Sequence, residues 1–226
     1  MSEEPEERLA GRQPASASQV TAGGQVRPAI LSVLVLSIVC GCVFPVILYA
    51  VGRPLFSRQA DGSLLTRDGV VIGSALIGQE FTRAEYFHSR PSAAGSGYDG
   101  TASGGTNLDP NSPKLRNGDR DFAGIRQLAG EYRRQNGLSG DTPIPVDAVT
   151  RSASGLDPDI SPANAELQVA RVAKARGVAE DDVRRMVAEH TQGPQFGFLG
   201  SPRVSVLALN LELDARSKSG AALQPR

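Results

Sequence analysis

The sequence is poor in the side chains that most often do chemistry in enzymes and metal sites. It has no tryptophan, two cysteines and two histidines, and aromatic residues make up 5% of it. Both cysteines, Cys40 and Cys42, lie in one apolar run, so the rest of the chain can form neither a disulfide nor a thiolate metal site. The formal net charge is zero, which predicts no general electrostatic attraction to nucleic acid.

One apolar run is long enough to span a membrane. Residues Ala29 to Val51 contain no charged side chain and no histidine, and about 20 apolar residues in a helix cross the hydrocarbon core. Pro28 stands where a helix start tolerates proline. We interpret the run as a membrane anchor; the alternative, a cleaved signal peptide, has a shorter apolar stretch. Arginines flank the run about equally, so charge does not predict the orientation.

Composition divides the chain into four predicted segments. The first is rich in Glu, Ser, Ala and Gly with almost no large apolar residues, which is typical of disorder. The third is long enough to bury a core of its own. We predict a disordered segment at 1–26, a transmembrane helix at 27–52, a single mixed α+β extracytoplasmic domain at 53–214 and a disordered tail at 215–226.

The predicted domain shows patterns of both helices and strands. Ser161 is a good N-cap and Pro162 a good first helical residue for a helix that ends at Gly177. The spacing of apolar residues also predicts helices from about Phe122 to Gly137 and from about Glu180 onward. Short strands are expected within Gly69 to Phe81, and the alternating leucines of Val204 to Leu213 predict a further strand.

The membrane helix carries a candidate packing surface. Ser37, Gly41 and Pro45 are spaced four apart, and a stripe of small residues lets helix backbones approach closely in lipid. The alternative is simple spanning, because Gly and Pro are common in membrane helices. A single helix whose only polar side chains are hydroxyls and thiols cannot line an ion pathway. Any transport function is therefore shared with other chains.

The patterns for catalysis and metal binding are weak. His88 is the remaining candidate for the base of a Ser-His-Asp hydrolase, since His190 continues an apolar helix face, and no Gly-x-Ser-x-Gly motif is present. The loop from Gly95 to Asn107 lacks the lysine of a phosphate loop, and its turn-forming composition predicts a flexible or partner-ordered loop. Asp157 and Asp159 could bind a hard cation, although turn and cap chemistry explains the pair equally well.

A series of short motifs follows the apolar run. Those of the first half are Leu76-Ile77-Gly78-Gln79-Glu80-Phe81, Tyr86-Phe87-His88-Ser89-Arg90-Pro91-Ser92-Ala93 and Gly105-Thr106-Asn107-Leu108. Those of the second half are Pro145-Val146-Asp147, Ser154-Gly155-Leu156-Asp157-Pro158-Asp159-Ile160-Ser161-Pro162, Gln168-Val169-Ala170-Arg171-Val172-Ala173, Phe198-Leu199-Gly200, Val206-Leu207 and Leu209-Asn210. With Arg27-Pro28 before the span, this order resembles the C subunit family of the bacterial Kdp potassium-transporting ATPase over residues 27 to 214.

The resemblance implies a non-catalytic accessory subunit of a high-affinity, ATP-driven potassium uptake complex. The partners it implies are a channel-like potassium-translocating subunit, a P-type ATPase subunit with the catalytic aspartate, and a small membrane peptide. It implies no cofactor for this chain, with ATP bound through the catalytic subunit. It also implies a single pass through the bacterial inner membrane, with the N-terminus cytoplasmic and the main domain extracytoplasmic. The role stated for the family is to support assembly and to raise the ATP affinity of the catalytic subunit.

The motifs also supply interface candidates. The loop from Ser92 to Asn107 and the turn from Ser154 to Ser161 are the predicted contact regions. The individual candidates are Arg90, Pro91, Ser92, Asn107, Gly155, Leu156, Asp157, Pro158, Gln168 and Arg171. The alternative from another class is a membrane-anchored extracytoplasmic hydrolase or a binding module unrelated to transport.

Overall fold

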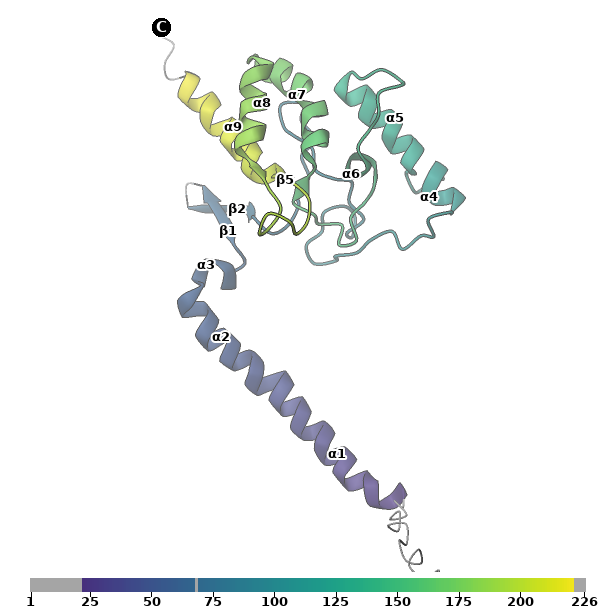
Figure 1. The fold of residues 1–226 in the computed structure, drawn as a ribbon, viewed down its shortest axis with the longest axis vertical. Helices are drawn as coiled ribbons and strands as arrows, with labels where there is room; N and C mark the ends of the chain where they lie inside the picture. Colours follow the sequence, from purple (N-terminus) through teal and green to yellow (C-terminus); the bar gives the residue numbers. More distant parts are fainter. Residues whose placement is uncertain (1–21, 68, 222–226) are drawn as a thin grey trace, which may run out of the picture. The chain divides into compact units, whose positions relative to one another are not determined.

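A computed structural model describes residues 22–67 and 69–221 of the chain. It divides into two compact units, Met1–Ala60 and Asp61–Arg226. In the first unit, α1 (Ala22–Ile38), a π-helical segment (Val39–Val43) and α2 (Phe44–Leu55) form one continuous helix, and the short α3 (Ser57–Ala60) follows (Figure 1). The stretch Gly24–Leu55 is long and apolar enough to cross a membrane, and none of its apolar window is buried within the chain.

The π-helical segment has a local cause in the sequence. Proline lacks an N–H group, and its ring clashes with the carbonyl four residues earlier; for Pro45 that carbonyl belongs to Gly41. Just before the proline, the Phe44 N–H donates to the carbonyl of Val39, five residues earlier. This wider turn relieves the clash and keeps the helix continuous through the proline.

The described helices extend past the predicted segment limits at both ends. The prediction that Pro28 starts the membrane helix is wrong, because α1 begins at Ala22 and contains Pro28 in its interior. A proline only biases the preceding residue away from the helical region, so it marks a probable helix boundary and does not require one. At the other end, α9 continues to Ala221, into the segment predicted as a tail. The rest of both predicted disordered segments lies outside the described residues.

The second unit is a mixed α+β domain, which confirms the predicted fold class. A hairpin of β1 (Leu64–Arg67) and β2 (Val70–Ser74) comes first. A small antiparallel sheet has the order β3-β5-β4 and consists of β3 (Asp159–Ile160), β4 (Thr191–Gln192) and β5 (Arg203–Ser205). The helices α7 (Pro162–Arg176), α8 (Glu180–Glu189) and α9 (Val206–Ala221) pack with it (Figure 1).

Two apolar clusters form the core of this domain. The larger one joins α7, α8 and α9 and consists of Phe87, Ile160, Ala165, Val169, Val172, Ala173, Val183, Met186, Val187, Val204, Val206, Leu209 and Leu213. The smaller one joins α5 (Ile125–Asn136) and α6 (Val146–Val149) through Tyr132, Ala148 and Val149. The short α4 (Pro113–Asn117) precedes α5. Apart from Tyr132 and Phe87, these side chains are small or aliphatic, as the scarcity of aromatics requires.

Three helices follow the sequence predictions closely. The side chain of Ser161 accepts a hydrogen bond from the backbone N–H of Asn164, which makes it the N-cap of α7, with Pro162 as its first residue. Gly137 and Gly177 end α5 and α7 at φ angles of +65° and +66°, where a residue without a Cβ is favoured. The helix α8 begins at Glu180, as predicted from its acidic first turn.

The predicted strand over Val204 to Leu213 is wrong in most of its length. The chain leaves β5 after Ser205 and forms α9, whose fully buried side chains are Val206, Leu209, Asn210 and Leu213. These positions follow the i, i+3, i+4, i+7 spacing of one helix face. Since seven of the ten residues from Val204 to Leu213 are apolar, the run fits a period of two as well as 3.6, and only contact with the core distinguishes a strand from a helix.

Candidate functional site

The segment from Ala84 to Pro91 contains most of the motif that begins at Tyr86, and it forms no regular strand. Two side-chain amides take the place of a neighbouring strand. The Asn210 amide accepts from the N–H of Phe87 at 2.8 Å and donates to its carbonyl at 2.9 Å. The Gln168 amide does the same for His88, at 2.7 Å and 3.2 Å. An amide has both a donor and an acceptor, so it can pair with a peptide group as another backbone would.

Arg171 extends this network toward the start of the segment. Its Nη1 donates to the carbonyls of Ala84 at 2.7 Å and Tyr86 at 2.9 Å. Its Nη2 donates to Gln168 Oε1 at 2.7 Å, and its Nε to Asn136 Oδ1 at 2.9 Å. Burial lowers the pKa of Arg171 to about 10, so the guanidinium keeps its charge at neutral pH. The polar groups of Gln168 and Arg171, two predicted interface residues, are therefore used within the chain.

The two predicted contact regions lie against each other. Ser92 Oγ donates to the carbonyl of Gly155 at 2.6 Å, and the N–H of Gly104 donates to the carbonyl of Ser154 at 2.9 Å. Ser103 Oγ donates to the same Ser154 carbonyl at 2.9 Å. The loop predicted to be flexible or partner-ordered is thus held in part by its own chain, and its contact with a partner stays a prediction. Turn composition indicated a loop but carried no information about a second segment distant in the sequence.

An ion pair supports this contact between the two regions. Arg90 Nη1 lies 2.8 Å from Asp157 Oδ2, and the Tyr98 hydroxyl donates to the Arg90 carbonyl at 2.5 Å. Burial raises the pKa of Tyr98 to about 12, so its hydroxyl keeps the proton that it donates. Among the other candidates, Leu156 is buried and the Pro158 carbonyl accepts from the N–H of Val206 at 3.1 Å.

The structure also places the two remaining interface candidates and the packing residues of the membrane helix. Pro91 lines a cavity beside His88, and Asn107 has a φ of +50° in the left-handed region. In the membrane helix, Gly41 lies inside the π-helical segment, with Ser37 in α1 and Pro45 in α2. An α-helix completes a turn in 3.6 residues, so a wider turn aligns residues four apart more closely. The π turn therefore keeps the small residues near one face.

The paired carboxylates of the predicted cation site are each neutralised by an arginine. Asp157 pairs with Arg90, and Asp159 pairs with Arg203 at 3.1 Å. Burial, and then the charge of Asp157, raises the pKa of Asp159. Within the described residues, no group of three or more His, Cys, Asp and Glu side chains could hold a metal ion. The arrangement is that of a structural ion-pair cluster.

His88 lies at a cavity of about 390 Å³, whose lining includes Glu80, Tyr98, Glu131 and Tyr132. Its Nε2 is 3.1 Å from the carbonyl of Arg83, and its backbone is held by Gln168. The hydroxyl of neighbouring Ser89 donates to the carbonyl of Gln79 at 2.9 Å. The imidazole therefore contacts a backbone carbonyl, whereas a Ser-His-Asp arrangement requires it to contact a nucleophile and a carboxylate.

Comparison with known proteins identifies the family. Residues 26–215 match the family KdpC, described as the K+-transporting ATPase, c chain. The chain belongs to the KdpC family. It is 50% identical over 190 residues to the potassium-transporting ATPase KdpC subunit of Mycobacterium tuberculosis (strain H37Rv), an alignment that covers 84% of this chain and 97% of the relative.

Relatives from other bacteria agree. The KdpC subunit of Koribacter versatilis is 50% identical over 185 residues, which cover 82% of this chain and 91% of the relative. That of Caulobacter vibrioides is 49% identical over 193 residues, which cover 84% and 93%. The resemblance drawn from the motifs is therefore confirmed. The chain is a non-catalytic accessory subunit of a potassium-transporting ATPase complex, and the hydrolase alternative is set aside.

Two polar residues of α9 that hold this KdpC domain together were not among the candidate site residues, although Asn210 stands in the Leu209-Asn210 motif. Asn210 pairs with Phe87, and Asp214 accepts from Arg176 Nη2 at 3.0 Å and from the Tyr86 hydroxyl at 3.1 Å. Burial acts to raise the pKa of Asp214, but the hydrogen bonds from Arg176 and Tyr86 hold that pKa below its usual range. The signal for Asn210 was an amide inside an otherwise apolar run, which indicates a buried polar contact.

His88 makes the stability of the domain depend on pH. Burial, and then the charge of Arg171, lowers the pKa of His88, so the folded state binds fewer protons than the unfolded state. The contribution of neutral His88 to the stability of the folded state is fully present above about pH 6.5, and it is lost as the pH falls below that value. We expect the wild-type Tm to fall more steeply than that of His88→Gln between pH 7 and pH 5. Parallel curves for the two proteins would contradict this prediction.

Proposed function

We propose that this KdpC-family chain is a single-pass assembly subunit that docks its helix on a channel-like potassium-translocating subunit. The domain lies outside the cytoplasm and stabilises or covers the potassium entrance of that subunit. The complex also contains a P-type ATPase subunit and a small membrane peptide. The observation that carries the proposal is the helix Gly24–Leu55, which is apolar throughout its core and buries none of that surface within its own chain.

The π turn of the helix supports close docking. At Gly41, an added Cβ would meet no atom within 4 Å apart from its chain neighbours and the adjacent helix backbone, so a neighbouring helix has access to this position. Helices in lipid associate through small residues that let backbones come together, and π turns occur frequently at functional sites. Ser37, Gly41 and Pro45 are the residues proposed to form this contact.

The polar network of the domain supports an accessory role. Gln168, Arg171 and Asn210 bind the backbone of the Ala84–His88 segment, and Arg90 pairs with Asp157. These contacts stabilise one fixed shape and leave the motif side chains engaged within the chain. A fixed body suits a subunit that presents a surface to partners.

ATP enters the proposal only through the catalytic subunit. A domain outside the cytoplasm cannot contact ATP inside it. Raising the ATP affinity of the catalytic subunit therefore requires a change passed through the membrane by an element with two states that both sites bias. We propose no cofactor for this chain, and deletion of the domain with unchanged assembly and potassium affinity would contradict the covering role.

Substitution of Gly41 tests the docking of the helix. We expect Gly41→Leu to reduce recovery of the channel-like and P-type ATPase subunits with the tagged full-length chain by at least about tenfold, since leucine blocks close backbone contact. Leucine is a better helix former than glycine, so the helix itself is preserved. Val46→Leu, at an apolar position of the same helix outside the Ser37, Gly41 and Pro45 stripe, is the matched control. Equal recovery with both variants would exclude docking through Gly41.

A single cysteine tests the orientation in the membrane. The residues after the membrane helix include no cysteine, so Ala102→Cys in a Cys40→Ala/Cys42→Ala chain gives one exposed thiol in the domain. We expect a membrane-impermeant maleimide to label this thiol in intact cells. Labelling only after the cells are broken would place the domain in the cytoplasm.

A further inference from the structure

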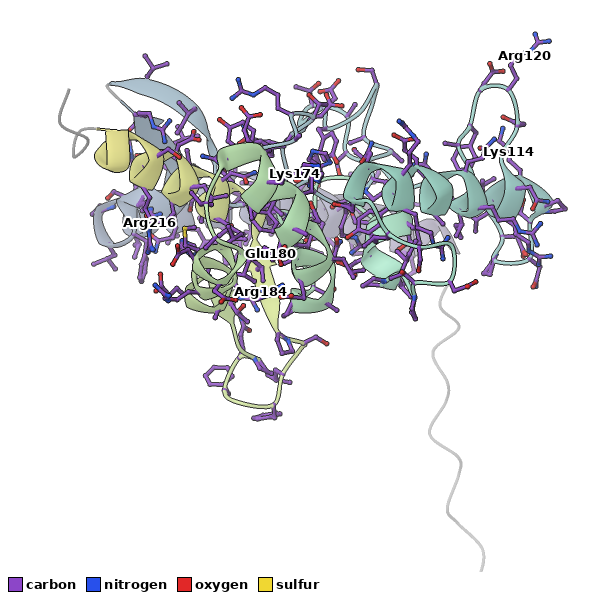
Figure 2. All side chains as sticks on the ribbon, turned by 90° about the horizontal axis from the view of Figure 1, so that it is seen from above. Lys114, Arg120, Lys174, Glu180, Arg184 and Arg216 are labelled. Atoms are coloured by element: carbon purple, nitrogen blue, oxygen red, sulfur yellow. The ribbon has the colours of Figure 1, made fainter. Side chains whose placement is uncertain are left out.

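The loop between β4 and β5 exposes the largest apolar side chains of the domain. Phe196 is 86% exposed, Phe198 75% and Leu199 49%. Figure 2 shows the loop projecting from the body of the domain, beyond the helix that carries Glu180 and Arg184. Soluble surfaces rarely group such residues without a binding function.

The loop has a defined shape. Gln195 and Leu199 exchange two backbone hydrogen bonds of 2.8 Å and 2.9 Å, and the N–H of Phe198 donates to Gln195 at 3.2 Å. Between them, Phe196 and Gly197 have φ angles of +53° and +81°. The tip of the loop is thus a tight turn with a defined backbone, from which both rings project.

The conformation of Phe196 gives the first argument for a function. The left-handed region favours Gly, Asn or Asp, because a Cβ atom is disfavoured there. Phenylalanine therefore destabilises this turn, and its exposed ring gains little from contacts within the chain. An unfavourable conformation of this kind points to a requirement outside the folding of the chain itself.

The absence of charged side chains from the loop is the second argument, and it favours a protein partner over a lipid surface. Residues 191–202 contain no Lys, Arg, Asp, Glu or His. Loops and helices that bind membrane surfaces combine apolar side chains with basic residues that attract anionic lipids. Protein interfaces instead have an uncharged core in which aromatic residues are enriched. The neighbouring α8 is charged, with Arg184 paired to Glu180 (Figure 2), so the uncharged loop is a local exception.

We propose that the loop of residues 193–202, which we name the phenylalanine loop, inserts Phe196 and Phe198 into an apolar pocket on the water-facing surface of a partner subunit. This inference rests on the proposed function, since it requires a partner in the transport complex. The chain belongs to a subunit family of a potassium-transporting ATPase, so a partner subunit is available to accept the loop. The loop forms the apolar core of a contact that adjacent polar residues complete.

Crosslinking in the intact complex tests the proposal. In the chain with Cys40→Ala and Cys42→Ala, Phe196→Cys or Phe198→Cys is labelled with benzophenone maleimide, which restores an aromatic group at the tip. We expect adducts between either site and a partner subunit, and none from Ser139→Cys, which lies exposed between α5 and α6, outside the predicted contact regions. Adducts with lipid, with a second copy of this chain, or with nothing would each overturn the proposal.

A pair of substitutions separates binding from folding. Phe196→Asn suits the left-handed conformation, so we expect the Tm of the purified full-length chain to rise by about 1–2 °C. Combined with Phe198→Ser, it is expected to lower recovery of partner subunits by about tenfold or more, because aromatic anchors dominate interfaces. Unchanged recovery would overturn the proposal. If the unsubstituted chain itself is recovered without partners, the proposed function fails instead.

Discussion

Replacing Asn210 with alanine is expected to lower the free energy of unfolding of the domain by about 3–5 kcal/mol. The substitution removes both hydrogen bonds to Phe87 and leaves its N–H and carbonyl without partners. Asn210 is 1% exposed and Phe87 is fully buried, so water cannot replace the lost amide. The small cavity left by the side chain adds to the loss.

Urea unfolding of the full-length chain in detergent, followed by circular dichroism, measures this effect. Asn111→Ala is the matched control, because it makes the same change at an exposed position, and surface substitutions change stability by less than about 0.5 kcal/mol. A loss below 1 kcal/mol for Asn210→Ala, as for an ordinary exposed hydrogen bond, would show that the amide does not act as a strand substitute.

Replacing Gly155 with alanine is expected to lower the free energy of unfolding of the domain by about 3 kcal/mol or more, for two separate reasons. Its φ of +68° is unfavourable for any residue with a Cβ, and that Cβ would lie 2.6 Å from both Ala94 N and Gly104 O. Both atoms belong to the backbone of the Ser92–Asn107 loop, which cannot rotate away as a side chain would. The substitution therefore forces the loop off the turn that it contacts.

Gly177→Ala measures how much of this loss of stability comes from the left-handed backbone alone, without a close contact. Gly177 has a nearly identical φ of +66°, but its added Cβ would meet no atom within 4 Å, so we expect a loss of only about 1 kcal/mol. The difference between the two variants, measured by the same unfolding experiment, gives the contribution of the close contact. Equal losses would mean that the loop is not packed against Gly155.

Several residues first selected as interface candidates contribute to the stability of the fold itself. Gly155, Gln168 and Arg171 hold separate parts of the domain together through the backbone contacts of the chain. The exposed Phe196 and Phe198 make no comparable contribution to the fold. The interface role of the candidates stays a prediction, and the structure adds the phenylalanine loop as a separate surface.

Several elements of the fold could be predicted because their signals are local. The apolar run that gives the membrane helix is a matter of length and composition within one segment. The limits of α7 depend on Ser161, Pro162 and Gly177, each of which acts on its nearest turn. At Pro45 the sequence predicted only a stripe of small residues for helix packing. It did not predict the π turn that precedes the proline.

The sequence by itself determined the membrane span, the capped helices and the motif order that identifies the KdpC family. Tertiary structure decided that Val206–Ala221 is a helix, that Asn210 pairs with Phe87, and that the glycine-rich loop lies on the Ser154–Gly155 turn. The physical reason is distance along the chain. Asn210 and Phe87 are 123 residues apart, and a pattern within one segment carries no information about which distant backbone group will need its hydrogen bonds.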